Sequence, residues 1–290
     1  MPATTNVKTI VCKSASDVAS QILAKDARLN KKLVAMLFKN KDIKLNGKRL
    51  SKNTQTNKGD VVSYFCTEDF INAQNKATEI ELKIVYEDEN ILVIDKPSAI
   101  ESAGKNSCEE ILKKKYKTIF AAHRLDRNTM GLLIFAKNEE ALSELKQATK
   151  ENRIEKSYLA WVCGEFKKSG SFTGYLFKDA KKSLALISAT QKPGYVKIET
   201  NIEPIKSGSE KSLVKVIIHN GKTHQIRAHL AFLGHPIIGD GKYGNNETNK
   251  KFKEKTQLLL AYKLKFNFKE ERLLCYLNNK TIEIKNAKFN

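Results

Sequence analysis

The sequence lacks the features that mark secreted, membrane-spanning and disulfide-rich proteins. It contains no run of about 18 apolar residues, which a membrane-spanning helix requires. Its first residues, MPATTNVKTI, lack the basic start and apolar core of a secretory signal. The five cysteines are far apart and include no CxxC pair. We therefore expect reduced thiols in a cytoplasmic protein that does not enter a membrane.

Acidic residues are also scarce relative to basic ones. The 290-residue chain has 52 Lys and Arg against 32 Asp and Glu, which gives a formal charge of +20. An excess of this size favours a polyanionic partner, and we expect nucleic acid. With 41% hydrophobic residues, the chain is globular in composition. It is long enough for one domain of about 200 residues and a smaller one.

Residues 16–52 have the pattern of a small basic module. Apolar residues at helical spacing predict two short helices. Asn46-Gly47, between two alternating segments, then predicts a hairpin. Eight basic residues and one acidic residue lie between Lys31 and Lys52, so we expect this module to contact phosphate groups. The candidate RNA-binding residues, called the basic hairpin below, are Lys44, Lys48, Arg49 and Lys52.

The remainder of the chain has the pattern of a larger domain. Residues 67–80 are polar and lack a clear period, which is typical of a linker. We therefore expect a small RNA-binding domain at residues 1–75, a linker to about residue 80, and a large domain at residues 81–290. Predicted strands in the large domain are interspersed with helices without strict alternation. This favours an α+β fold with a mixed, largely antiparallel sheet and flanking helices.

The stretch HRLDRNTMGLLIF, residues 123–135, places the carboxylate of Asp126 between Arg124 and Arg127 before a predicted buried strand. An aspartate at such a place is usually a turn or capping residue. The flanking arginines instead favour an ionised carboxylate, which acts as a nucleophile or a charge stabiliser and not as a general acid. If the chain is extended here, Arg124 and Asp126 share one face and Arg127 does not.

A second stretch, GKTHQIRAHL at residues 221–230, predicts a helix with Thr223 as its N-cap. Arg227 then lies in the first turn, where a cation opposes the helix dipole at a cost of about 0.3–1 kcal/mol. A phosphate, or a carboxylate from elsewhere in the fold, should offset this cost, and Asp126 is the candidate that we expect. Four histidines around this helix are spaced five, five and six residues apart, without the i, i+4 pair of a helical metal site. Packing or phosphate contacts are therefore expected for them, and no metal.

A third stretch, RIEKSYLAWV at residues 153–162, places Tyr158 on a predicted strand after Arg153 and Lys156. A tyrosine on a strand is more often part of the core than of a functional site. Bordered by two cations that can bind phosphate, however, its ring suits stacking on a base splayed out of RNA.

Two resemblances join these stretches. Residues from about 15 to 66 resemble the small RNA-binding domain that is named after a protein of the small ribosomal subunit. Residues from about 82 to 268 resemble the RluA-type family of pseudouridine synthases. The second resemblance rests on five motifs in the family's order, namely ILVIDKP, HRLDRNTMGLLIFAKN, RIEKSYLAWV, GKTHQIRAHLAFLGHPIIGD and LLLAYKLKF.

The second resemblance implies an isomerase that converts uridine into pseudouridine in RNA without a cofactor or a metal. It implies that Asp126 is the catalytic aspartate, that Tyr158 stacks on the target base, and that Arg227 pairs with the aspartate. Arg124 would help to extrude the base. Asp126 would either attack the anomeric carbon of the sugar or assist deprotonation at its 2′ position, and the sequence leaves this choice open.

The expected substrate is large-subunit (23S) ribosomal RNA, because many family members that act on ribosomal RNA carry the small RNA-binding domain. Transfer RNA is the alternative substrate. A non-catalytic RNA-binding factor of ribosome assembly is the alternative to an enzyme, although such a factor would have no reason to retain both Asp126 and Arg227. A monomer is expected.

Overall fold

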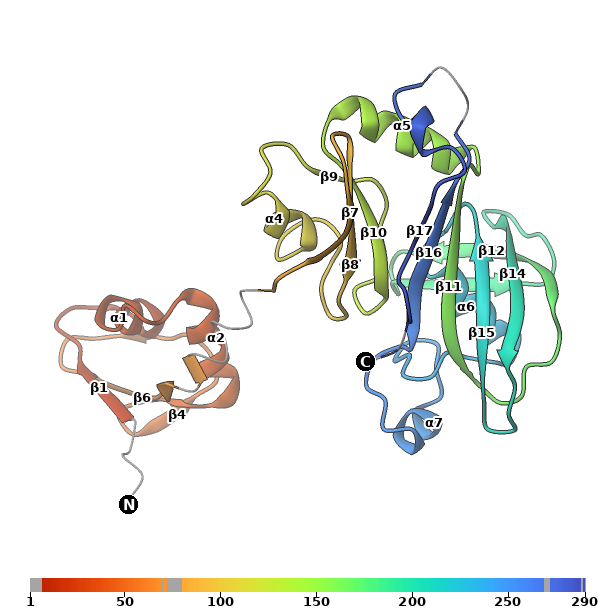
Figure 1. The fold of residues 1–290 in the computed structure, drawn as a ribbon. Coiled ribbons are helices and arrows are strands. Elements are labelled where there is room, and N and C mark those ends of the chain that lie inside the picture. The colour runs from red at the N-terminus through yellow and green to blue at the C-terminus, as the bar shows by residue number, and fades with distance from the viewer. Residues whose placement is uncertain (1–6, 69, 72–79, 269–271, 288, 290) are drawn as a thin grey trace. The chain divides into compact units, whose positions relative to one another are not determined.

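The computed structural model describes residues 7–68, 70–71, 80–268, 272–287 and 289. The chain divides into two compact units, Met1–Glu81 and Leu82–Asn290 (Figure 1). Each unit has its own apolar core. Most of the expected linker, residues 72–79, lies outside the described residues.

The N-terminal unit is a four-stranded antiparallel sheet covered by two helices, with strand order β1-β6-β3-β4. Asp17 and Asn30 cap the two helices, since their side chains accept hydrogen bonds from the Ser20 and Leu33 N–H groups. A separate short pair of strands lies beside them. The elements are β1 (Val7–Val11), β2 (Ser16–Asp17), α1 (Val18–Lys25), α2 (Lys31–Asn40), β3 (Ile43–Leu45), β4 (Lys48–Leu50), β5 (Gln55–Thr56) and β6 (Val61–Phe65).

The C-terminal unit is built on an 11-stranded sheet whose main path has the order β13-β12-β14-β15-β11-β16-β10-β8-β7. β9 and β17 pair with β10 and β16 outside this path. All pairs are antiparallel except β10 with β16. The expected α+β class with a mixed, largely antiparallel sheet is therefore confirmed. The strands are β7 (Lys83–Glu87), β8 (Ile91–Lys96), β9 (Phe120–Ala121), β10 (Met130–Ala136), β11 (Ile154–Cys163), β12 (Gly170–Asp179), β13 (Leu184–Ser188), β14 (Val196–Lys206), β15 (Lys211–Ile218), β16 (Leu259–Phe266) and β17 (Thr281–Glu283).

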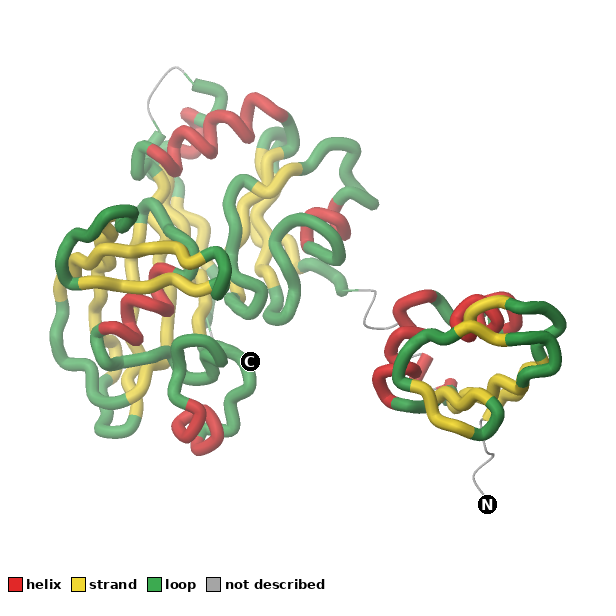
Figure 2. The backbone as a smooth tube through the Cα atoms, turned by 180° about the vertical axis from the view of Figure 1, so that it is seen from behind, coloured by secondary structure: helices red, strands yellow, loops and turns green. Residues whose placement is uncertain are grey.

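Two helices matter most for the arrangement of this sheet. α5 (Glu139–Lys150) begins after Asn138, whose side chain accepts a hydrogen bond of 2.8 Å from the Ala141 N–H group, and it lies across one end of the sheet (Figure 1). α6 (Gln225–Phe232) packs on β13 and β14 and is enclosed by the curled sheet (Figure 2). The other helical elements are α4 (Cys108–Leu112), α7 (Asn246–Lys251) and the 3-10 turn η1 (Cys275–Leu277).

A glycine makes the single parallel pairing possible. Gly131 has φ +106°, and a Cβ atom on it would lie 2.1 Å from the carbonyl oxygen of Ala261 on β16. The close approach draws β10 against β16 in register. It therefore places the loop that precedes β10, which carries Asp126, beside the centre of the sheet.

Of the helices in the described part of the chain, none combines the length and the apolarity that a membrane span needs. All five cysteines are described, and all are free thiols.

Candidate active site

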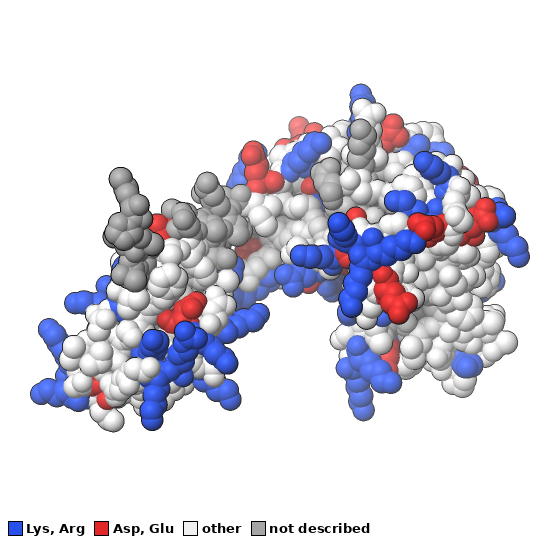
Figure 3. Space-filling view, turned by 90° about the horizontal axis from the view of Figure 1, so that it is seen from below, with Lys and Arg blue, Asp and Glu red and all other residues white. Residues whose placement is uncertain are grey.

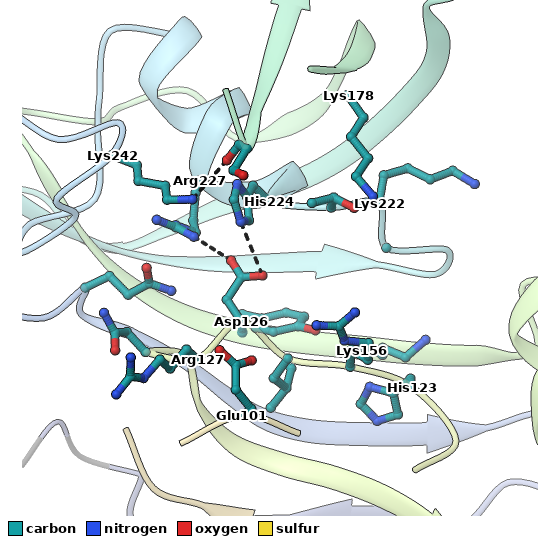
Figure 4. A pocket seen from close by; sticks show the side chains of 18 of the residues that line it. Glu101, His123, Asp126, Arg127, Lys156, Lys178, Lys222, His224, Arg227 and Lys242 are labelled. Carbon is teal, nitrogen blue, oxygen red and sulfur yellow. Dashed lines mark hydrogen bonds and ion pairs between the residues drawn. The ribbon is translucent and has the colours of Figure 1, made fainter. Parts of the chain in front are cut away.

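Asp126 lies in the loop between β9 and β10, with Arg124 and Arg127 on either side. Leu125 is buried and anchors the loop, because Ser102 Oγ donates to its carbonyl at 3.0 Å and accepts from its N–H group at 2.9 Å. Lys96 Nζ holds the next turn by donating to the Arg127 carbonyl at 3.0 Å. With Leu125 inward, Arg124 and Asp126 line a cavity of about 910 Å³ (Figure 4).

Arg227 supplies the contact that the helix-dipole argument predicts for Asp126. Its Nη1 atom donates to Asp126 Oδ2 at 2.7 Å, across 101 positions of sequence. In the described part of the chain, neither flanking arginine forms a hydrogen bond or an ion pair with Asp126. Arg127 Nε donates to the Ala99 carbonyl at 3.1 Å, and among the described residues Arg124 forms no ion pair. Sequence neighbours on an extended loop point apart, whereas α6 aims Arg227 directly at the carboxylate.

Arg227 also binds a second carboxylate, Asp240, which the sequence reading missed. Arg227 Nε and Nη2 donate to the Asp240 oxygens at 2.7 and 2.9 Å, and Asp240 is 1% exposed. Backbone N–H groups of Lys242 and Tyr243 donate to Asp240 Oδ1 as well. The only sequence signal was an aspartate between Gly239 and Gly241, just after the apolar run PII.

The paired charges outweigh the cost of burying them. Burial alone would raise the pKa of Asp240, but the hydrogen bonds and charge of Arg227 hold it below its usual range. Burial alone would likewise lower the pKa of Arg227, and Asp240 and Asp126 together raise it above its usual value. A bidentate arginine–carboxylate pair of this kind fixes direction as well as charge. Asp240 therefore anchors Arg227, and Arg227 orients Asp126.

The start of α6 differs from the prediction. Its N-cap is His224 and not Thr223, and His224 forms no side-chain capping hydrogen bond. The Gln225 side chain instead accepts from the Lys222 N–H group at 3.0 Å and closes the turn. His224 has φ +53°, a left-handed conformation that costs about 1–3 kcal/mol and is found at functional sites. This backbone directs its ring towards Asp126, with Nε2 at 3.9 Å from Oδ1 (Figure 4).

Tyr158 and Lys156 lie on the same face of β11 and line the same cavity. Tyr158 is 6% exposed, and burial together with the charge of Asp126 raises the pKa of its phenol. Lys156 Nζ donates to the His219 carbonyl at 3.1 Å, and burial lowers its pKa to about 8. Arg153, expected as a cation beside the tyrosine, is instead buried against Glu151 and the Phe268 ring, outside the cavity lining.

The cavity is strongly cationic. Seven basic side chains line it against two carboxylates, those of Glu101 and Asp126. Figure 4 labels all of the basic residues except Arg124 and shows that they come from several elements around Asp126. Such a lining suits a phosphate-bearing ligand. The basic residues are Arg124, Arg127, Lys156, Lys178, Lys222, Arg227 and Lys242.

The basic hairpin forms in the N-terminal unit as β3 and β4. Asn46 and Gly47 at its turn both have positive φ, at +48° and +82°, as a two-residue hairpin requires. All four of its basic side chains are exposed, and within the described ranges none forms an ion pair. Figure 3 shows basic side chains gathered over the visible face of this left-hand unit.

The histidines do not assemble a metal site in the part of the chain that the structure describes. No group of three His, Cys, Asp or Glu side chains there could hold a metal ion. His229 Nδ1 bonds to Thr200 Oγ1 at 2.9 Å and His235 Nδ1 to the Cys163 carbonyl at 3.0 Å, so both serve packing.

Known proteins share these motifs and this fold. Residues 90–232 match the sequence profile of the family described as RNA pseudouridylate synthase. The chain is 33% identical over 179 residues to "Ribosomal large subunit pseudouridine synthase C" of Vibrio vulnificus, covering 59% of this chain and 56% of that protein. It is 33% identical over 273 residues to an "Uncharacterized RNA pseudouridine synthase" of Mycoplasma capricolum, covering 86% of each. The solved structure "Human RNA Pseudouridylate Synthase Domain Containing 1" has a TM-score of 0.58 and 25% identity over 67% of this chain and 81% of that one.

Proposed function

The chain belongs to the RNA pseudouridylate synthase family, and from this premise we propose that it isomerises uridine to pseudouridine in RNA. One observation carries the proposal. Asp126 stands in an open cationic cavity with Oδ2 bound to Arg227, which leaves Oδ1 directed to the cavity. A carboxylate held by one oxygen and free at the other is suited to act on a sugar.

The reaction breaks the bond between uracil N1 and the C1′ atom of the sugar, turns the uracil, and joins its C5 atom to C1′. The C5 atom loses a proton, and N1 gains one. In our proposal Asp126 Oδ1 is the reacting atom, either as a nucleophile on C1′ or as a base at C2′. Both routes need the carboxylate in one orientation, and the chain Asp240–Arg227–Asp126 provides that orientation.

Tyr158 serves in this proposal as a neutral contact surface for the uracil. Because burial and the Asp126 charge raise the pKa of Tyr158, its phenolate is scarce at neutral pH. A neutral phenol is a poor proton acceptor but can stack on a base and donate a hydrogen bond. We therefore assign the removal of the C5 proton to a group other than the Tyr158 phenolate.

Arg124 serves in this proposal at the mouth of the cavity. It is exposed and its guanidinium forms no ion pair with another described residue. Extruding a base from a stack costs a few kcal/mol. A free planar cation there can occupy the place of the base and contact the neighbouring phosphates. The lysines of the cavity offset the cost of extruding the base through contacts with the RNA backbone.

Large-subunit ribosomal RNA is the substrate that we propose. The name of the Vibrio relative supports it. The resemblance of residues from about 15 to 66 to a small RNA-binding domain, with an exposed basic hairpin, supports it as well. We propose that the basic hairpin binds the RNA backbone outside the target nucleotide. A cytoplasmic location and a monomeric state remain predictions from the sequence.

Tritium release from RNA that carries uridine labelled at C5 tests the proposal. The wild type should release tritium from a large-subunit ribosomal RNA transcript and not from transfer RNA. Asp126→Asn should release none and still bind the RNA in a filter assay. Asp95→Asn, a carboxylate on β8 outside the cavity lining, is the matched control and should remain active.

Other results would lead to different conclusions. Release by Asp126→Asn at the wild-type rate would exclude Asp126 as the reacting residue. Release from transfer RNA alone would change the substrate. No release by the wild type from either RNA, despite tight binding, would favour the non-catalytic alternative.

A further inference from the structure

The two oxygens of Asp126 have different neighbours. Oδ2 accepts from Arg227 Nη1 at 2.7 Å, and the remaining nitrogens Nε and Nη2 of Arg227 are taken by Asp240. Oδ1, the oxygen that is free to react, lies 3.9 Å from His224 Nε2 (Figure 4). This distance is beyond a hydrogen bond in the free protein, but catalytic hydrogen bonds are often long before the substrate binds.

Tyr243 holds the far side of the His224 ring. The Tyr243 hydroxyl lies 2.9 Å from His224 Nδ1, and the two rings meet edge to face with centroids 5.6 Å apart. The same hydroxyl accepts a hydrogen bond of 2.6 Å from the Ala185 N–H group on β13. The ring is therefore held through Tyr243 by contacts with β13, which is separate from the loop of Asp126.

These contacts favour one of the two neutral tautomers of His224. The Tyr243 hydroxyl already accepts from a backbone N–H group, so its own hydrogen needs an acceptor. His224 Nδ1 is the acceptor within reach. A neutral imidazole whose Nδ1 accepts must carry its hydrogen on Nε2. The Nε2–H group then points to the reacting oxygen of Asp126.

The charges around the ring come from three segments. Asp126 lies on the loop before β10, Arg227 on α6, and Asp240 with Lys242 on the turn after residue 238. Burial lowers the pKa of His224, and the two cations add to this effect, while the two carboxylates oppose it. The imidazole is therefore neutral at neutral pH, which is the state that the hydrogen-bond argument requires.

We propose that His224 is a positioning residue whose Nε2–H group, set by Tyr243, directs Oδ1 of Asp126 towards the sugar. The inference rests on the proposed function and assigns a role to a residue of the same site. It explains why a strained left-handed histidine begins α6 where Ser, Thr, Asp or Asn would be a better cap. No proton moves to or from His224 in this role, so the ring acts as a donor and not as a base.

The proposal predicts a separation between turnover and binding. A misplacement of about 1 Å at a reacting group can cost about 100-fold in rate. His224→Ala should lower kcat by about 10- to 100-fold and leave KM within about 2-fold, since the donor acts on Asp126 and not on the RNA. His224→Gln should recover most of the loss, because its amide N–H reaches the position of Nε2 and needs no particular tautomer.

Two measurements test the inference on the full-length protein. Tritium release gives kcat and KM for the wild type, His224→Ala and His224→Gln. Nitrogen-15 NMR of the histidine-labelled protein reports the tautomer, and we expect a protonated Nε2 and an unprotonated Nδ1 for His224. In Asp126→Asn the pKa of His224 should fall further, because the carboxylate charge raises it in the wild type.

The outcomes separate the inference from the proposed function. A wild type without tritium release would refute the proposed function and, with it, the positioning role of His224. A wild type that is active but has hydrogen on Nδ1 would overturn only the inference. The same holds if His224→Ala keeps its kcat, if His224→Ala raises KM as much as it lowers kcat, or if His224→Gln is no better than His224→Ala.

Discussion

The two carboxylates that share Arg227 should have different roles. Replacing Asp240 should mainly lower the stability of the protein, and replacing Asp126 should mainly abolish its activity. Asp240 is 1% exposed and receives two hydrogen bonds from Arg227 and two from backbone N–H groups. In Asp240→Asn only one of the two carboxylate oxygens remains as an acceptor, so it can accept only part of these four hydrogen bonds. The amide NH₂ then faces an Arg227 N–H group, donor against donor. The guanidinium is thus deprived of its buried counter-charge.

The size of the effect follows from this geometry. Breaking a buried ion pair by removing one partner costs about 3–5 kcal/mol. Arg227 retains Asp126, so we expect the lower end, about 3 kcal/mol. For a unit of about 200 residues this lowers Tm by about 6–12 °C. Asp126→Asn keeps an acceptor oxygen for Arg227 on a side chain that is 26% exposed, so it should cost about 1 kcal/mol or less.

Thermal unfolding at neutral pH, combined with tritium release, tests this separation. Asp240→Asn should be destabilised and retain reduced activity, because Arg227 is less firmly held. Asp126→Asn should be stable and inactive. Because the pKa of Asp240 is lowered in the folded state, its contribution is complete above about pH 4 and is lost as the pH falls through that lowered value. The Tm difference between Asp240→Asn and the wild type should therefore shrink in acid.

Two results would refute the reasoning. One is an Asp240→Asn protein with the same Tm as the wild type, which would mean that Arg227 does not need Asp240 to be held in place. The other is an Asp126→Asn protein that is destabilised as much as Asp240→Asn, which would mean that the two carboxylates are equivalent supports.

Three further predictions concern other parts of the chain. Gly131→Ala should lower the free energy of unfolding by more than about 3 kcal/mol, because its Cβ would meet the Ala261 carbonyl at 2.1 Å. Gly47→Ala has open space and should lower it by only about 1–2 kcal/mol. Equal losses for the two variants in urea unfolding would contradict this. Lys156 loses its charge near pH 8, so KM for RNA should rise above that pH in the wild type and stay flat in Lys156→Met. Replacing three basic side chains of the basic hairpin with Gln should weaken RNA binding and leave kcat at saturating RNA unchanged. The slope of log K against log salt concentration should become shallower by about 0.7–0.9 for each phosphate that is no longer neutralised. An unaltered slope would mean that the RNA binds elsewhere on the protein.

Local structure was readable from the sequence where neighbouring residues determine it. Asn138 caps α5 through an N–H group three residues away, and Asn46-Gly47 turns a hairpin whose strands are adjacent. Apolar runs such as LLIF of β10 are fully buried in the sheet. These features depend on hydrogen bonds and packing over a few positions, so the pattern alone predicts them.

The position of Arg153 was predicted wrongly. Arg153 was expected beside the site because it is close to Tyr158 in sequence, but in the structure it packs on the Phe268 ring. Nearness along an extended chain does not predict contact, because alternate side chains point to opposite faces. Thr223 was expected as a cap from its residue type, but the Gln225 side chain closes that turn.

The sequence by itself determined the class of fold, the basic character of both units, and the pairing of Asp126 with Arg227. An arginine in the first turn of a helix needs an anion nearby, and the sequence alone shows that Arg227 has this position. Only the tertiary structure decided that Asp240 holds the same arginine and that the Tyr243 hydroxyl lies against Nδ1 of His224. Those contacts join a loop, a helix and a turn that meet only when the sheet curls around α6. Their geometry depends on distances of tenths of an ångström between groups that are far apart along the chain.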